Sequence, residues 1–167
     1  MFQEKALSIL KSGKNVFLTG SAGTGKTYTL NAYIQWLKEH KVPVAITAST
    51  GIAATHMNGT TIHSWSGIGI KNTLTHSDLK SMQGKQYLTK NISKTHILII
   101  DEISMLHRNQ LNMINQALKY LRNSAQPFGG MQVVFAGDFF QLPPVSKEAT
   151  PSREKFAFMS KAWVEAA

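Results

Sequence analysis

Eight residues near the start of the chain, Gly20 to Thr27, have the types and spacing that bind phosphate. They read GSAGTGKT and match the pattern G-x-x-x-x-G-K-[S/T] in full. The glycines let backbone N–H groups converge on phosphate oxygens, and a helix that begins here adds its positive end. Lys26 can then reach the β- and γ-phosphates of a nucleotide, and the Thr27 hydroxyl can bind Mg²⁺. A chance glycine-rich turn is the alternative, but the apolar run before the loop and the helical pattern after it favour a nucleotide site.

Two acidic residues, Asp101 and Glu102, follow the apolar run ILII. A carboxylate at the end of a buried strand can hold a metal ion through water, and its neighbour can orient or deprotonate an attacking water. Alone such a pair is a weak signal, because an acid after a buried strand is common. Ligands of parallel α/β sheets bind at the carboxyl ends of the strands, so we expect this pair to lie near the phosphate loop. The second acid favours hydrolysis and argues against a nucleotide or metabolite kinase.

Apolar periodicity predicts alternating helices and strands around these residues. A first helix should end at Lys11, before Gly13, and a second should carry the apolar stripe Leu30, Tyr33, Ile34 and Leu37. The expected strands are NVFLTG, VAITA, ILIID and QVVFAG, with a helix carrying Leu111, Ile114, Leu118 and Leu121 before an FGG turn. Strands that alternate with helices over one short domain predict an α/β fold with a mostly parallel, buried sheet.

Length and composition limit the class of protein. The 167 residues suffice for one domain, and a hydrophobic fraction of 43% is that of a folded globular protein. The absence of cysteine excludes disulfides and thiolate metal sites. No apolar run is long enough to cross a bilayer, and the first residues do not resemble a signal peptide. We therefore expect no membrane association and an intracellular location: the cytoplasm and nucleoid of a bacterium, or the nucleus or mitochondrion of a eukaryote.

The charge balance favours a polyanionic partner. Lys and Arg number 18 against 9 acidic residues, which gives a net charge of +9. Residues 66–95 form a polar, lysine-rich segment in which we expect loops and one or two short helices. Its lysines are interpreted as a solvated surface rather than a binding patch; they are Lys71, Lys80, Lys85, Lys90 and Lys94.

Several longer motifs occur in a characteristic order: TGSAGTGKT, TASTGIAA, GTTIHSW with GIG, ILIIDEISM, and PFGG leading into GDFFQLPPV. This series resembles the Pif-one-type DNA helicases, RecD-like motors of helicase superfamily one, class B, from Gln3 to Trp163. The resemblance implies a RecA-like P-loop NTPase domain in which helices flank the sheet as three αβα layers. It also implies that the strand entering GDFFQLPPV lies between the phosphate-loop strand and the strand that ends in Asp101.

The resemblance assigns roles around the nucleotide. Gln3, 17 positions before Gly20, matches a glutamine that recognises adenine, although a solvated residue of the first helix is the alternative. The implied catalytic residues are Lys26, Glu102 and Gln141, and the implied Mg²⁺ ligands are Thr27 and Asp101. The implied ATP-binding residues are Gln3, Gly20, Ser21, Ala22, Gly23, Thr24, Gly25, Lys26, Thr27 and Tyr28.

Gln141 lies in GDFFQLPPV, where it matches a glutamine that senses the γ-phosphate and couples it to DNA contacts. A neutral amide can donate and accept hydrogen bonds without changing the local charge. Pro143 and Pro144 prevent the strand from continuing and stiffen its exit. We expect Phe139 or Phe140 to anchor this segment in the core.

The resemblance also assigns single-stranded DNA contacts to Thr50, Gly51, Thr61, His63 and Trp65. Hydroxyls and backbone N–H groups can hold phosphates without reading sequence, and an exposed aromatic ring can stack on a base. Two alternatives stay open: Trp65 as a core residue and His63 as a structural histidine.

The implied activity is ATP hydrolysis that drives 5′-to-3′ translocation on single-stranded DNA and duplex unwinding. Such a motor needs a second RecA-like domain, which supplies arginine fingers and is absent from residues 1–167. We therefore expect the isolated domain to bind ATP and Mg²⁺ but to unwind nothing. The alternative is a stand-alone, ATP-dependent DNA-binding switch or accessory module without significant turnover. A P-loop ATPase unrelated to DNA is more remote, because TTIHSW and GDFFQLPPV argue against it.

Overall fold

A parallel β-sheet forms the centre of the protein. The computed structural model describes residues 2–19, 25–138 and 162 of the chain. Within them one five-stranded sheet has the order β1-β5-β4-β2-β3, and every adjacent pair is parallel. The strands are β1 Val16–Thr19, β2 Val44–Ala48, β3 Thr60–Thr61, β4 Ile97–Asp101 and β5 Gln132–Gly137. The strand before GDFFQLPPV thus lies between the phosphate-loop strand and β4, as predicted.

The central strands are apolar because both of their faces are covered. In β4, Leu98 and Ile100 pack into one hydrophobic cluster, whereas Ile97 and Ile99 pack into the other. Val133 and Phe135 of β5 alternate with Val134 and Ala136 in the same way. Successive side chains point to opposite faces of a strand, so a strand buried on both faces reads as a continuous apolar run.

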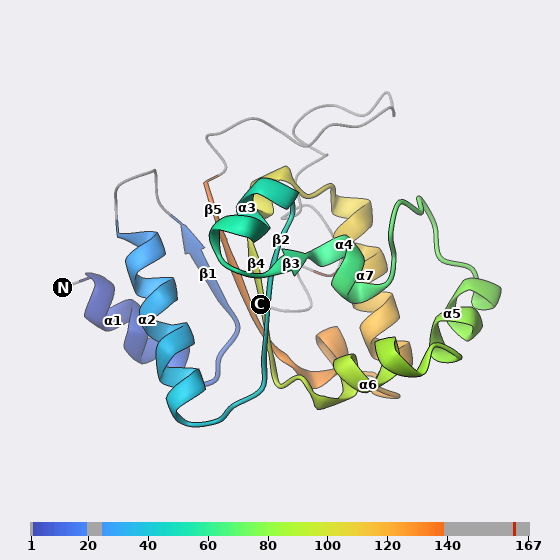
Figure 1. The fold of residues 1–167 in the computed structure, drawn as a ribbon, viewed down its shortest axis with the longest axis horizontal. Helices are drawn as coiled ribbons and strands as arrows, with labels where there is room; N and C mark the ends of the chain where they lie inside the picture. Colours follow the sequence, from blue (N-terminus) through green and yellow to red (C-terminus); the bar gives the residue numbers. More distant parts are fainter. Residues whose placement is uncertain (1, 20–24, 139–161, 163–167) are drawn as a thin grey trace.

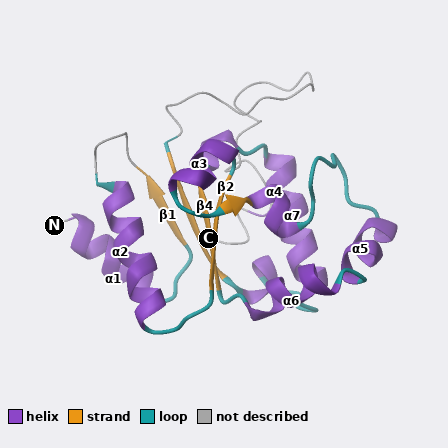
Figure 2. Ribbon diagram, in the orientation of Figure 1, coloured by secondary structure: helices purple, strands orange, loops and turns teal. Residues whose placement is uncertain are grey.

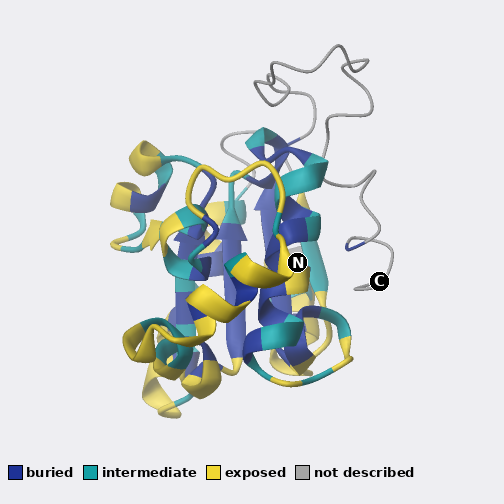
Figure 3. Ribbon diagram, turned by 90° about the vertical axis from the view of Figure 1, so that its right-hand side faces the viewer, coloured by how far each residue is buried: buried dark blue, intermediate teal, exposed yellow. Residues whose placement is uncertain are grey.

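Helices cover the two faces of the sheet (Figures 1 and 2). On one face lie α1 Phe2–Lys11 and α2 Lys26–Glu39, and the predicted stripe of α2 is buried there. The other face is covered chiefly by α7 Arg108–Leu121, with further short helices beside it. Those are α4 Ile62–Ser66, α5 His76–Gln83 and α6 Gln86–Lys94. Figure 3 shows the buried strands between these two layers, and the predicted three-layer αβα arrangement is confirmed.

Short connecting elements complete the fold. Helix α3 Gly51–His56 follows β2, while the 3₁₀ turns η1 Ile103–Met105 and η2 Pro127–Gly130 follow β4 and precede β5. The sequence predicted the FGG turn and the two short helices within residues 66–95, but not β3, α3 or α4. Elements of two to six residues carry too few side chains for a periodic signal. None of the described helices is long and apolar enough to span a lipid bilayer.

Arg122 joins three elements beside the sheet. Its Nε donates to the carbonyl of Gly129 in η2 at 2.8 Å. Its Nη1 donates to the carbonyls of Ile92 and Thr95, at the end of α6, at 2.9 and 2.8 Å. These carbonyls belong to a helix end and a turn, where the helix itself supplies no N–H partner. Arg122 therefore has a structural role, in agreement with its position outside the motifs expected to hold an arginine finger.

We predict that Arg122→Ala lowers the free energy of unfolding by about 1–3 kcal/mol, because hydrogen bonds from a charged donor are lost and buried carbonyls lose partners. Chemical denaturation with circular dichroism measures the change. Lys90→Ala, which removes a charge from the exposed side of α6, serves as the control and should change stability little. Equal effects of the two substitutions would contradict the structural role of Arg122.

Candidate nucleotide and nucleic-acid site

The carboxyl ends of the parallel strands bring the sequence-predicted residues to one edge of the sheet. The phosphate loop follows β1 and leads into α2, the Asp101–Glu102 pair ends β4, and Ser49 to Gly51 follow β2. Asp138 follows β5 and is buried. Six predicted site residues lie outside the described residues, namely Gly20, Ser21, Ala22, Gly23, Thr24 and Gln141, as do Phe139, Phe140, Pro143 and Pro144.

The start of α2 is built around Gly25. Its φ of +86° is in the left-handed region, and it is the residue that precedes the first turn of the helix. Lys26 is half-buried, whereas Thr27 and Tyr28 are exposed. The side-chain amide of Gln3 lies directly against Gly25, in the space that a Cβ would occupy. The fold therefore brings the predicted adenine-recognising residue to the end of the phosphate loop, although 22 residues of chain separate it from Gly25.

The acidic pair has a constrained backbone. Glu102 has φ 54° and ψ 42°, a left-handed conformation that costs about 1–2 kcal/mol for a residue with a side chain. Hydrogen bonds hold it in place: the Glu102 N–H donates to Asp101 Oδ1 at 2.9 Å, and the Glu102 carbonyl accepts from the Met105 N–H at 3.1 Å. The same carbonyl accepts from the Ser49 hydroxyl at 2.6 Å. Ser49 is a contact that sequence analysis missed; its position next to Thr50, in TASTG, was the available signal.

The donor set suits Mg²⁺. Among the described residues no group of three or more His, Asp or Glu side chains could cage a metal ion. Mg²⁺ is usually held by one or two protein oxygens together with substrate phosphates and water, so a cage is not needed. The exposed hydroxyl of Thr27 and the half-exposed carboxylate of Asp101 are oxygen ligands of this kind.

Two of the predicted DNA contacts are threonines that precede short helices. Thr50 Oγ1 accepts from the Ala53 N–H at 3.2 Å, and Thr61 Oγ1 accepts from the Ser64 N–H at 3.3 Å. A hydroxyl that accepts one hydrogen bond can still donate its own hydrogen. Gly51 is exposed, and a Cβ added to it would meet no atom within 4 Å. Each of these groups can therefore approach a phosphate.

His63 is tied to the start of α7. The half-buried imidazole forms a hydrogen bond with Gln110, and Gln110 Oε1 accepts from the His107 N–H at 3.0 Å. Burial lowers the pKa of His63, and the bond to Gln110 offsets this only in part. The neutral form therefore prevails in the folded protein, which agrees with the structural alternative for His63.

Trp65 is half-buried between two environments. It packs against the hydrophobic cluster of the α7 face, and it lines a cavity of about 410 Å³ at the sheet edge together with Thr60, Asn91 and Lys94. The ring thus contributes to the core while part of it faces this cavity. All five lysines of residues 66–95 are exposed, as expected of a solvated surface.

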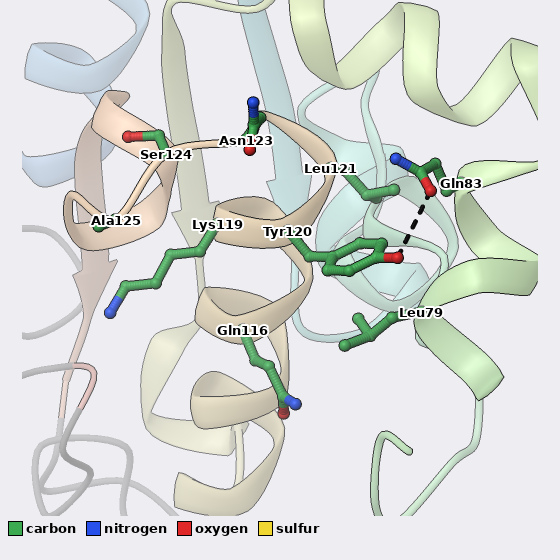
Figure 4. A pocket seen from close by; sticks show the side chains of 9 residues that line it. All are labelled: Leu79, Gln83, Gln116, Lys119, Tyr120, Leu121, Asn123, Ser124 and Ala125. Carbon is green, nitrogen blue, oxygen red and sulfur yellow. Dashed lines mark hydrogen bonds between the residues drawn. The ribbon is translucent and has the colours of Figure 1, made fainter. Parts of the chain in front are cut away.

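Another cavity lies away from the strand ends (Figure 4). Its volume is about 670 Å³, and it lies between α5 and the C-terminal half of α7. Tyr120 Oη donates to Gln83 Oε1 across it at 3.4 Å. Its lining contains one cation, Lys119, and no carboxylate or histidine. The chemistry of the predicted residues is therefore at the carboxyl edge of the sheet and not in this cavity.

Comparison with known proteins accounts for this arrangement. The family described as "PIF1-like helicase" matches residues 3–167. The chain belongs to the PIF1-like helicase family. It is 65% identical over 166 residues to an ATP-dependent DNA helicase Pif1 of Psychrobacter sp. (strain PRwf-1), covering 99% of this chain and 25% of that protein.

Solved structures of this family share the fold. A crystal structure of the Pif1 helicase from Candida albicans aligns with a TM-score of 0.89 at 42% identity, covering 98% of this chain and 37% of that one. A Pif1 helicase from Bacteroides in complex with ADP-AlF3 and ssDNA aligns with a TM-score of 0.79 at 31% identity, covering 98% and 39%. The predicted RecA-like α/β fold is confirmed. The chain spans about a quarter of the length of the Psychrobacter relative.

We predict that Gly25→Ala weakens nucleotide binding by roughly tenfold or more. A side chain at this φ is strained by about 1–2 kcal/mol, and the new Cβ displaces Gln3. Titration with a fluorescent ATP analogue measures the affinity. Gly51→Ala, at a position with free space, is the matched control and should leave nucleotide affinity unchanged. A normal affinity of Gly25→Ala would contradict the observed Gln3 contact.

We also predict a pH-dependent contribution of His63 to stability. Because its folded-state pKa is lowered, the unfolded chain binds more protons at this position as the pH falls below about 6.5. The contribution of neutral His63 is thus present above that pH and is lost toward pH 5. His63→Gln should flatten this part of the pH profile in urea unfolding, whereas His56→Gln, on the exposed side of α3, should not. Parallel profiles for wild type and His63→Gln would exclude the effect.

Proposed function

We propose that this chain is the first motor domain of an ATP-dependent DNA helicase, which couples ATP hydrolysis to 5′-to-3′ movement on single-stranded DNA and to duplex unwinding. One observation supports this most: the phosphate-loop helix, the acidic pair and the Thr50–Gly51 segment all lie at the carboxyl edge of one parallel sheet. The names of its relatives, and a relative solved with ADP-AlF3 and ssDNA, agree with it.

At the nucleotide, each residue has a chemical task. Backbone N–H groups of residues 20–25 and the start of α2 would bind the phosphates, and Lys26 would neutralise the β- and γ-phosphates. The Gln3 amide is beside Gly25 and can reach the base from there. Mg²⁺, held by Thr27 and, through water, by Asp101, would neutralise charge that develops on the phosphates.

Glu102 would orient and deprotonate the attacking water. Its carboxylate is half-exposed at the strand end, and its backbone is held by the bonds to Asp101, Met105 and Ser49. A base fixed in this way does not have to be ordered during the reaction. Gln141, beyond β5, would sense the γ-phosphate and couple it to DNA.

DNA would lie across the elements that follow β2 and β3. The hydroxyls of Thr50 and Thr61, with the backbone of Gly51, would hold phosphates without reading base sequence. Trp65, which is in part exposed to a cavity, would stack on a base. His63 would hold the segment against α7 through Gln110.

The remaining part of the motor is a second RecA-like domain elsewhere in the full-length chain. The relatives are long enough to contain one, since this chain covers 25% of the Psychrobacter protein and 37% of the Candida albicans structure. That domain would supply an arginine finger, which is worth roughly 10³–10⁵ in rate in other P-loop enzymes. Residues 1–167 alone would then bind nucleotide without unwinding DNA. The protein would act wherever the cell keeps its DNA: the bacterial nucleoid, or a eukaryotic nucleus or mitochondrion.

The test measures ATP hydrolysis by the full-length protein with and without single-stranded DNA. We expect strong stimulation by DNA. Glu102→Gln should keep nucleotide binding and lose about 10²–10⁴ of the stimulated rate, because the general base is removed. Lys26→Ala should weaken nucleotide binding itself. ATP binding with DNA affinity but no stimulated turnover would replace the motor by a DNA-binding switch, and unwinding by residues 1–167 alone would contradict the need for a second domain.

A further inference from the structure

A pair of hydrogen bonds joins the ends of β2 and β4. The last residues of the two strands are paired, Ala48 with Asp101. One residue further on, the Ser49 N–H donates to the Asp101 carbonyl at 3.1 Å. The Ser49 hydroxyl then reaches past the ladder and donates to the Glu102 carbonyl at 2.6 Å. Ser49 is 9% exposed, so water competes little for this bond.

These bonds determine how Glu102 is presented. Its backbone is left-handed, at φ 54° and ψ 42°, which a glutamate adopts only when its surroundings enforce it. The N–H is held by Asp101 Oδ1, while the carbonyl is held by both Met105 and Ser49. The first two bonds come from the same loop. Ser49 is the one described partner from another strand, and it fixes the loop relative to the sheet.

On its other side, Ser49 is bonded covalently to the segment proposed to bind DNA. Thr50 precedes α3 and accepts from its Ala53 N–H, and Gly51 is exposed as the first residue of that helix. A single peptide bond therefore separates the partner of Glu102 from Thr50. Any shift of Thr50 and Gly51 on a DNA strand is transmitted to the Glu102 carbonyl.

We propose that Ser49 is a positioning residue for Glu102, which links occupation of the DNA-binding segment to the orientation of the water-activating carboxylate. This rests on the proposed function of Glu102 and of the Thr50–Gly51 segment. Ser49 does not touch the substrate: it acts through the Glu102 backbone. Single-stranded DNA that orders residues 50 and 51 thereby favours the productive orientation of Glu102.

The same strand pair offers a matched control. Thr47, two residues earlier in β2, donates its hydroxyl to the carbonyl of Ile99 in β4 at 2.7 Å. This bond has the same type and crosses the same two strands, and Thr47 is 0% exposed. However, it lies within the sheet and does not contact the acidic pair. Thr47→Val removes that bond and retains the shape of the side chain.

The experiment compares Ser49→Ala, Ser49→Thr and Thr47→Val in the full-length protein. Steady-state ATP hydrolysis gives kcat and KM with and without single-stranded DNA, and thermal unfolding reports folding. Ser49→Ala and Thr47→Val each remove one hydrogen bond, so we expect similar decreases in Tm, on the order of 2–8 °C. Only Ser49→Ala should lower the DNA-stimulated kcat, by roughly tenfold or more, since displaced catalytic groups lose rate steeply. KM for ATP should change little, and Ser49→Thr should restore most of the rate.

The outcomes separate this proposal from the proposed function. If wild type shows no stimulation by DNA, the motor function fails first. If wild type is stimulated and Ser49→Ala retains a normal stimulated kcat, Ser49 does not position Glu102. If Ser49→Ala and Thr47→Val lose the same rate and the same stability, Ser49 is only a structural residue of the sheet. If Ser49→Thr does not fold, the comparison of the other two variants still decides.

Discussion

Parallel pairing of β4 with β2 on one side and β5 on the other is the constraint on which the site depends. Parallel strands end at the same edge of a sheet, so residues that follow different strands meet there even when they are far apart in the chain. The register pairs Ala48 with Asp101 and Thr19 with Gly137, which aligns the ends of four strands. The phosphate loop, the acidic pair and the TASTG segment become neighbours through this register.

The sheet can have this form only because both of its faces are covered. Helices α1 and α2 bury one face and α7 with its neighbours buries the other, which removes the backbone of the central strands from water. Burial also makes the edge selective, because loops leave the core at the strand ends and only there. Arg122 stabilises the opposite part of the α7 layer, where it gives the carbonyls at the end of α6 and in η2 a donor.

Rigidity at the catalytic edge comes from hydrogen bonds to the backbone more than from contacts between charged side chains. Glu102 is held by its own N–H and carbonyl, His63 is tied to the α7 start by Gln110, and Gln3 lies against Gly25. A backbone fixed in this way leaves the carboxylate, hydroxyl and ammonium groups available for ligands. It also means that displacement of a strand end acts directly on the groups that perform chemistry.

The sequence by itself determined the elements and the chemical groups. The phosphate loop, the apolar runs of β4 and β5, the α2 and α7 stripes and the Asp101–Glu102 pair are local patterns, because periodicity and short motifs depend on neighbouring residues. The resemblance to a helicase family added the strand order and the roles of Gln3 and Gln141. The tertiary structure decided the rest: the hydrogen bond of Ser49 to Glu102, the Gln110 contact of His63, the half-buried state of Trp65 and the Arg122 bonds. Each of these joins residues that are distant in the chain, and only the packing of strands and helices brings such residues together.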